Sequence, residues 1–80
     1  MSKGIDKQLI GVAAKFLEVD PSAINLESAP GDLPRWDSFA QIGLIGAVEA
    51  NFNVAFDVEE VTMFETLGDI HDAVKRRLST

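Results

Sequence analysis

Apolar residues recur along the chain at the spacings of amphipathic helices, and no segment alternates as a β-strand would. Near the N-terminus, one apolar stripe contains Ile5, Leu9, Val12, Phe16 and Leu17. This spacing predicts a helix over residues 4–18 that turns the stripe toward the core. The helix is expected to end before Asp20-Pro21, because proline disfavours helical backbone in the residue that precedes it.

The middle of the chain carries a second helical pattern, over residues 38–51. Its larger apolar residues fall on one side of a helical wheel: Leu44, Ile45, Val48 and Phe52. The other side carries Phe39, Gly43, Gly46 and Ala50. We therefore expect the first set in the core, followed by a short extended link over residues 54–56.

Two patterns typical of helix N-termini follow this link. Asp57, with Glu60 three residues later, resembles a capping box and predicts a short helix that ends near Phe64. Thr66 and Asp69 repeat the device at the start of a last helix. The apolar residues of that helix are Leu67, Ile70, Val74 and Leu78. Lys75, Arg76 and Arg77 come in its last turn, where cations complement the helix dipole.

A long connection, over residues 19–37, separates the first two helices. Asp20 can cap one short turn that has Pro21 at its first position, and Ile24 and Leu26 are expected to anchor the connection to the core. A connection this long is unusual in a chain of 80 residues and is often functional. The expected fold is all-α: a single-domain four-helix bundle over residues 1–80, with a long first loop and a short third helix.

Composition narrows the class of partner. The formal net charge of −6 argues against nucleic acid, because phosphate binding needs a basic surface. An acidic surface instead attracts basic patches on other proteins, or serves only solubility. The chain has no cysteine, which excludes disulfides and suits a reducing compartment. No apolar stretch approaches the ~20 residues of a membrane span, and nothing resembles a signal peptide. We expect a monomeric cytoplasmic protein without a membrane span.

Few side chains are candidates for chemistry. His71 is the single histidine, and without a nearby cysteine or second histidine it is a poor metal ligand. We therefore expect an ordinary surface or boundary residue there and no metal site. No catalytic triad order or phosphate-binding glycine loop occurs, and a small helical domain is a poor scaffold for an enzyme. The expected protein is not a catalyst.

The remaining candidate is Ser38, which follows Trp36-Asp37 at the start of the second predicted helix. In one interpretation Ser38 is only the helix N-cap, and Gln41 three residues later completes a capping box. In the other, its exposed hydroxyl lies beside free backbone N–H groups and the positive end of the helix dipole, where an attached phosphate is favoured. The local motif alone fits the N-cap.

The chain as a whole resembles the acyl carrier protein superfamily, over about residues 5–78. That family has Asp-Ser-Leu at the start of the second of four helices, which reads Asp37-Ser38-Phe39 here. The match continues through Ile42, Leu44-Ile45, Ala47-Val48-Glu49 and Phe52. Residues 66–70, Thr-Leu-Gly-Asp-Ile, look like the family's Thr-Val-Gly-Asp entry into the fourth helix.

The resemblance implies that a phosphopantetheinyl transferase attaches 4'-phosphopantetheine from coenzyme A to Ser38. Asp37 would assist by helping to place the magnesium ion, besides stabilising the helix N-terminus. Acyl or aminoacyl groups would then be carried as thioesters, loaded by an acyl- or aminoacyl-loading ligase and passed to acyltransferase or synthase enzymes. The carrier itself performs no catalysis.

The second helix departs from that of fatty-acid-type carriers, since Glu49 is its one charged residue. This argues against a carrier of fatty-acid synthesis, and the sequence Trp36-Asp37-Ser38 resembles that of stand-alone carriers of specialised pathways. The residues expected to meet partners are Trp36, Phe39, Ile42, Gly43, Gly46, Glu49, Glu59 and Glu60. The glycines suggest a flat apolar docking face or, alternatively, packing against the long loop. Trp36 either contacts the arm or a partner, or packs the loop on the core.

Two other functions stay open at this stage. One is a helical protein-binding module without a prosthetic group, in which Ser38 is only a cap. The other is an anionic regulatory or inhibitor domain that uses the acidic residues of the 57–69 segment against a basic partner.

Overall fold

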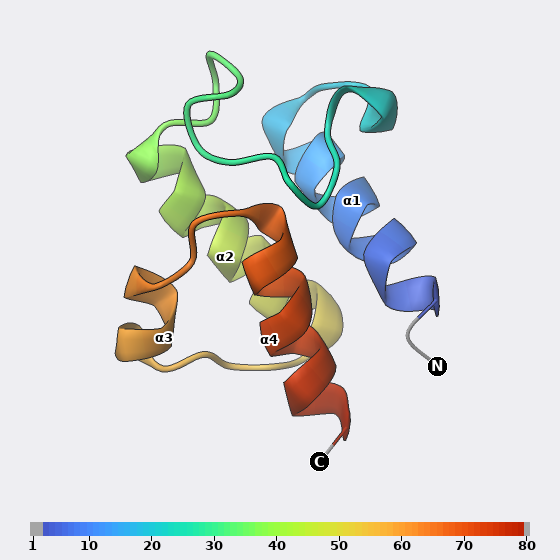
Figure 1. Ribbon diagram of the computed structural model, residues 1–80, viewed down its shortest axis with the longest axis vertical. Coiled ribbons are helices and arrows are strands. Elements are labelled where there is room, and N and C mark those ends of the chain that lie inside the picture. Colours follow the sequence, from blue (N-terminus) through green and yellow to red (C-terminus); the bar gives the residue numbers. More distant parts are fainter. Residues whose placement is uncertain (1–2, 80) are drawn as a thin grey trace.

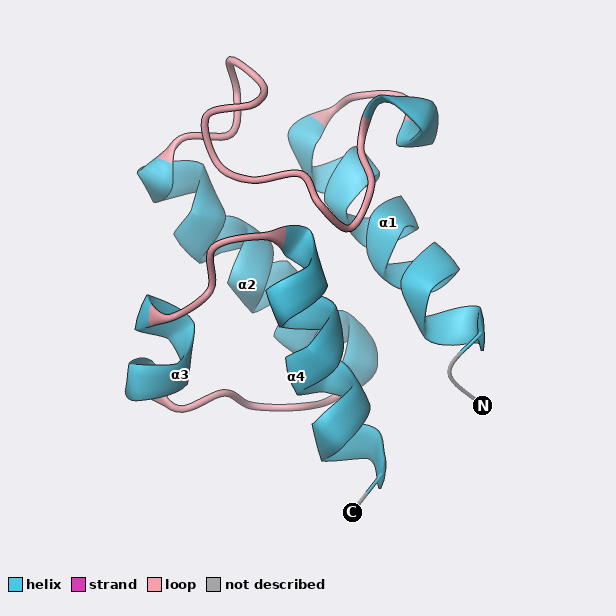
Figure 2. Cartoon of the chain, viewed as in Figure 1, coloured by secondary structure: helices cyan, strands magenta, loops and turns pink. Residues whose placement is uncertain are grey.

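The computed structural model describes residues 3–79 and contains only helices and connections within them (Figures 1 and 2). The elements are α1 (Lys3–Leu17), a short 3-10 turn η1 (Pro21–Ala23), α2 (Ser38–Phe52), α3 (Val58–Thr62) and α4 (Leu67–Ser79). The all-α prediction is confirmed, including the long first connection and the short third helix. Each predicted boundary lies within one or two residues of the observed one.

Helix α1 packs against both α2 and α4. The connection between η1 and α2 crosses one end of the molecule and reaches the start of α4 (Figure 1). There the backbone N–H groups of Leu67 and Gly68 donate to the carbonyls of Ser28 and Leu26, at 2.9 and 2.6 Å. The connection is thus bonded to the bundle at the N-terminus of α4, and buried Ile24 anchors it further, as predicted.

The core confirms the pattern of α2 and corrects that of α1. In α2 the buried residues are the predicted Leu44, Ile45, Val48 and Phe52. In α1 the buried row is Leu9, Ala13 and Leu17, with Ala14 beside it. Phe16 is 41% exposed, so its assignment to the core is wrong. The small residues Ala13 and Ala14 lie on the core side of α1, and the larger Phe16 lies outside the buried row.

Helix α4 follows its predicted stripe for most of its length. Leu67, Ile70 and Val74 are fully buried, whereas Leu78 is about half exposed because it lies in the last turn. The predicted capping box at its start is confirmed. The Asp69 N–H donates to Thr66 Oγ1 and the Thr66 N–H donates to Asp69 Oδ2, both at 3.2 Å.

Of the other two predicted caps, one is confirmed and one is wrong. The turn η1 has Asp20 as its N-cap, whose carboxylate accepts from the Ser22 N–H at 2.9 Å, as expected. Asp57 is the N-cap of α3 but makes no side-chain capping bond. The predicted capping box with Glu60 is therefore wrong, because the Glu60 carboxylate is held by arginines of α4 instead.

Candidate functional site

Trp36 closes the long connection and is fully buried in the core. Its indole Nε1 donates to the Gln41 side-chain oxygen at 2.7 Å, one turn into α2. A buried indole usually needs such a partner for its N–H. Trp36 therefore packs the loop on the core and offers no surface to a partner, so its assignment to the docking set is wrong.

The N-cap of α2 is Asp37, not Ser38. Asp37 Oδ1 accepts a hydrogen bond from the Ala40 N–H at 2.8 Å, which is the bond that defines a side-chain N-cap. Gln41 is engaged with Trp36 and does not return to the helix start. The capping interpretation of Ser38 is wrong, because the carboxylate one residue earlier already fills that role.

Ser38 is consequently the first residue of α2, and its side chain is exposed. Within the described residues the Ser38 hydroxyl makes no hydrogen bond, and the backbone N–H groups of Ser38 and Phe39 donate to no intramolecular acceptor. These N–H groups belong to the first turn, where a helix leaves donors unpaired and its dipole is positive. An exposed hydroxyl and two unpaired donors thus meet at one point beside the Asp37 carboxylate.

The outward side of α2 beyond Ser38 is apolar and exposed. Phe39 is 85% exposed and Ile42 is 67% exposed. Gly43 and Gly46 are also exposed but differ in their surroundings. A Cβ added to Gly43 would lie 2.6 Å from the Phe16 ring, whereas one added to Gly46 would meet nothing within 4 Å. Gly43 therefore accommodates the Phe16 ring of α1 rather than the long loop, and no contact among the described residues explains the glycine at position 46.

The acidic members of the predicted docking set lie apart from this face. Glu49 is half-buried, and its carboxylate accepts from the Phe56 N–H at 2.8 Å, which ties the link after α2 to the helix. Glu59 is exposed on α3 and stays a docking prediction. Glu60 is only 17% exposed and forms ion pairs with Arg76 and Arg77.

Arg77 extends the Glu60 contact into a clamp between α3 and α4. Its Nε donates to the Ala55 carbonyl at 3.0 Å, and its guanidinium lies 5.8 Å from the Phe56 ring centroid. The Phe56 ring in turn meets Phe64 edge-on, with centroids 5.3 Å apart. Since α3 has only five residues and none of them is fully buried, this clamp adds to the packing of partly buried Val61 in holding α3 to the bundle.

We expect Glu60→Gln to lower the free energy of unfolding by about 1–2 kcal/mol, since it removes the charge from a partly buried pair with two arginines. Urea unfolding followed by circular dichroism measures this loss. The neighbouring Glu59→Gln is the matched control, because Glu59 is exposed and should change stability by less than about 0.5 kcal/mol. Equal effects of the two substitutions would contradict the clamp.

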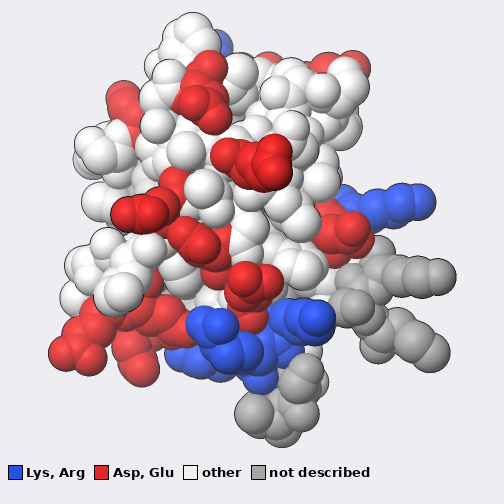
Figure 3. Space-filling model, in the orientation of Figure 1, with Lys and Arg blue, Asp and Glu red and all other residues white. Residues whose placement is uncertain are grey.

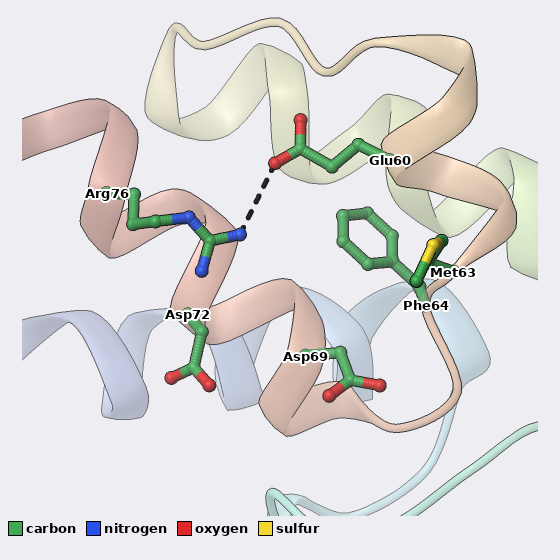
Figure 4. A pocket seen from close by; sticks show the side chains of 6 residues that line it. All are labelled: Glu60, Met63, Phe64, Asp69, Asp72 and Arg76. Carbon is green, nitrogen blue, oxygen red and sulfur yellow. Dashed lines mark hydrogen bonds and ion pairs between the residues drawn. The ribbon is translucent and has the colours of Figure 1, made fainter.

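A shallow hollow of about 290 Å³ lies between α3 and α4 (Figure 4). Its lining residues are Glu60, Met63, Phe64, Asp69, Asp72 and Arg76. The Asp69 carboxylate is already bound to the Glu65 and Thr66 N–H groups as a cap, and Arg76 is paired with Glu60 at 3.4 Å. Within the described residues no three His, Cys, Asp or Glu side chains form a group that could hold a metal ion.

Charge is distributed unevenly over the surface. On the face that carries α3 and α4, acidic side chains spread over most of the surface, and basic ones gather near the C-terminal end of α4 (Figure 3). His71, on α4, is mostly buried, and its Nδ1 lies 3.5 Å from the Asp72 carboxylate. In the described part of the chain, no helix has the length and apolar character needed to cross a membrane.

No protein-family model matches the chain, and no curated protein matches its sequence. The function must therefore be inferred from the residues themselves.

One feature escaped the sequence pattern. Phe16 fits the periodicity of a core residue, yet it lies on the surface over Gly43 and joins α1 to the apolar side of α2. The alanine pair at 13–14, with Ala13 in the same row as Leu9 and Leu17, is the signal that could have placed Phe16 outside the core.

Proposed function

We propose that this protein is an acyl or aminoacyl carrier, with 4'-phosphopantetheine attached to the Ser38 hydroxyl. The observation that carries the proposal is the position of Ser38: first residue of α2, exposed, next to the N-cap carboxylate of Asp37, and directly after a long connection. The resemblance to acyl carrier proteins across the chain supports it. The proposed type is a non-catalytic carrier of a specialised pathway in the cytoplasm.

The residues at the start of α2 fit a phosphodiester-linked arm. The unpaired N–H groups of Ser38 and Phe39 can donate to phosphate oxygens, and the helix dipole favours the negative charge there. Among the described residues, the Ser38 hydroxyl has no hydrogen-bond partner that it must leave before it reacts. When bound, the prosthetic group supplies a long flexible arm with a terminal thiol, on which substrates are held as thioesters.

The chain's own residues then position the arm. Trp36, buried and bonded to Gln41, fixes the end of the loop against the first turn of α2. Asp37 uses Oδ1 for the cap, which leaves Oδ2 able to assist the transferase in placing magnesium. A carrier held this way raises the effective concentration of its substrate at each partner enzyme. The proposed partners are the transferase, a loading ligase, and acyltransferase or synthase enzymes.

The test is modification by a broad-specificity phosphopantetheinyl transferase with coenzyme A and magnesium, read by intact mass. We expect one phosphopantetheine increment on the wild-type chain and none on Ser38→Ala. Asp37→Asn should slow the reaction by about tenfold or more and leave its end point unchanged, because only the metal-placing charge is lost. A folded wild-type chain that gains no mass would overturn the proposal.

Ser22 provides a matched control. Like Ser38 it is exposed and lies near a helix start, but its hydroxyl donates to Asp20 Oδ1 at 2.8 Å. The bonds from Ser22 to this carboxylate lower the pKa of Asp20. Ser22→Ala should therefore be modified at the wild-type rate, so that loss in Ser38→Ala reports the site and not serine removal in general.

The alternative function is a helical protein-binding module without a prosthetic group. The exposed apolar side of α2 favours it, since Phe39 and Ile42 face solvent on a helix that carries a single charge. Its original form, with Ser38 as N-cap, no longer applies because Asp37 holds that position. An unmodified but well-folded chain in the mass experiment would favour this module.

A further inference from the structure

A second pocket lies in the groove between α1 and α2, away from the start of α2. It has a volume of about 230 Å³ and is lined by Val12, Lys15, Phe16, Ala47 and Asn51. Gln8 donates to the Asn51 side-chain oxygen at 2.8 Å and bridges the two helices one turn from Val12. One turn from Ala47 in the other direction, the Phe16 ring lies over Gly43. The groove is open between these two contacts because Ala47 is small.

The size of this pocket favours a protein partner over a small molecule. Small-molecule sites usually enclose about 300–1,000 Å³, and the pocket between α1 and α2 is smaller, at about 230 Å³. It has room for one or two apolar side chains. Three of its five lining residues, Val12, Phe16 and Ala47, are apolar, so the side chain that fits against them is aliphatic or aromatic.

Exposed apolar side chains that a partner could contact also lie on this side of α2. Phe39 and Ala47 are eight residues apart, which on a helix places them in one row, about 12 Å from each other. Phe39 is 85% exposed and Ile42, beside it, is 67% exposed. A helix laid along this row would meet Phe39 with one apolar residue and the pocket with another, two turns further on.

The charges around the groove indicate which kind of partner helix would bind there. Lys15 lies at the rim of the pocket, and no carboxylate of the described residues forms an ion pair with it. Along α2 the one charged side chain, Glu49, is bonded to the Phe56 N–H. The face with α3 and α4 is strongly acidic (Figure 3). An acidic helix is therefore repelled from that face and attracted at Lys15, whereas a basic helix is drawn elsewhere.

We propose that the α1/α2 groove is the docking site for an amphipathic helix of a partner protein. That helix carries two apolar residues about two turns apart, one for Phe39 and one for the pocket, and an Asp or Glu that pairs with Lys15. The proposal goes beyond the carrier function and does not depend on the modification of Ser38.

The test is selection from a displayed library of amphipathic helical peptides of about 16 residues, long enough to cover the groove at ~1.5 Å per residue. The target is the folded, unmodified chain. We expect enriched peptides with apolar residues at i and i+7 or i+8 and at least one nearby acid. Ala47→Gln fills the pocket and should weaken their binding at least tenfold. Ala23→Gln, in exposed η1, is the matched control and should bind normally.

A second pair of variants tests the charge. Lys15→Glu and Lys7→Glu change the net charge by the same amount, and both lysines are exposed on α1, but only Lys15 lines the pocket. We expect about tenfold weaker peptide binding for Lys15→Glu and little change for Lys7→Glu. Circular dichroism confirms that each variant is folded. Ser38→Ala should bind the peptides as the wild type does, which separates this proposal from the carrier function.

Several outcomes would overturn the proposal. One is a selection that enriches no peptide, or that enriches basic peptides whose binding ignores Ala47→Gln. Another is equal loss from the two lysine substitutions, which would reduce the effect to net charge. A wild-type chain that sediments as a dimer, with the dimer lost in Ala47→Gln, would assign the groove to a second copy of the chain.

Discussion

Trp36→Ala should remove a large part of the free energy of unfolding in one substitution, a loss of about 3–5 kcal/mol. The indole is fully buried and is the largest side chain in the core. For a chain of 80 residues the total free energy of unfolding is about 4–12 kcal/mol. With a urea m-value near 1 kcal/mol/M, the midpoint should fall by roughly 3–5 M. Circular dichroism measures it, since the substitution removes the single tryptophan.

Two further variants show which part of the indole matters. Phe39→Ala removes an aromatic ring three residues away that is 85% exposed, and it should change stability by less than about 0.5 kcal/mol. Trp36→Phe keeps a ring in the core but leaves the Gln41 oxygen without its donor, at a cost of about 1–3 kcal/mol. Combining Trp36→Phe with Gln41→Leu removes both polar partners and should recover part of that loss. A Trp36→Ala protein as stable as Phe39→Ala would contradict the burial of the indole.

The helices were predictable where large apolar residues follow one clean period. Leu44, Val48 and Phe52 recur every four residues, and their row is the buried one. In α1 the same periodicity assigned Phe16 to the core, because a large apolar residue gives a stronger pattern than an alanine. The core side is set instead by Ala13 and Ala14, whose small size fits where helices pack.

The site was predictable only in part, because loop residues have no period from which burial follows. Trp36 precedes α2 directly and was open to either interpretation until its packing was known. The position of Ser38 was expected, but its neighbour Asp37 took the capping role through one bond to Ala40. Glu60 had a local explanation as a cap, and its true partner Arg77 lies 17 residues away. A contact between residues so far apart in the sequence cannot be predicted from the spacing of neighbouring residues.

Replacing the helical glycines Gly68 and Gly46 with alanine should change the free energy of unfolding in opposite directions. A Cβ on Gly68 would lie 2.9 Å from the Leu26 carbonyl oxygen, which already accepts the Gly68 N–H. Because that oxygen is backbone, Gly68→Ala must push the long connection away from α4, at about 1–3 kcal/mol. Gly46 has open space around it, so Gly46→Ala gains only helix propensity and should stabilise by about 1 kcal/mol.

Urea unfolding of the two glycine variants should therefore give midpoints roughly 2–4 M apart, for the same chemical change in two helices of one protein. Gly43→Ala falls between them, because the atom it meets is the far end of the partly exposed Phe16 ring, which can swing aside. Stabilisation by Gly68→Ala would mean that the long connection is not held against α4. Destabilisation by Gly46→Ala would mean that Gly46 is required inside the fold. If Gly46→Ala is stabilising as expected, the glycine serves no internal packing, and close approach of a partner to α2 becomes the physical reason for it.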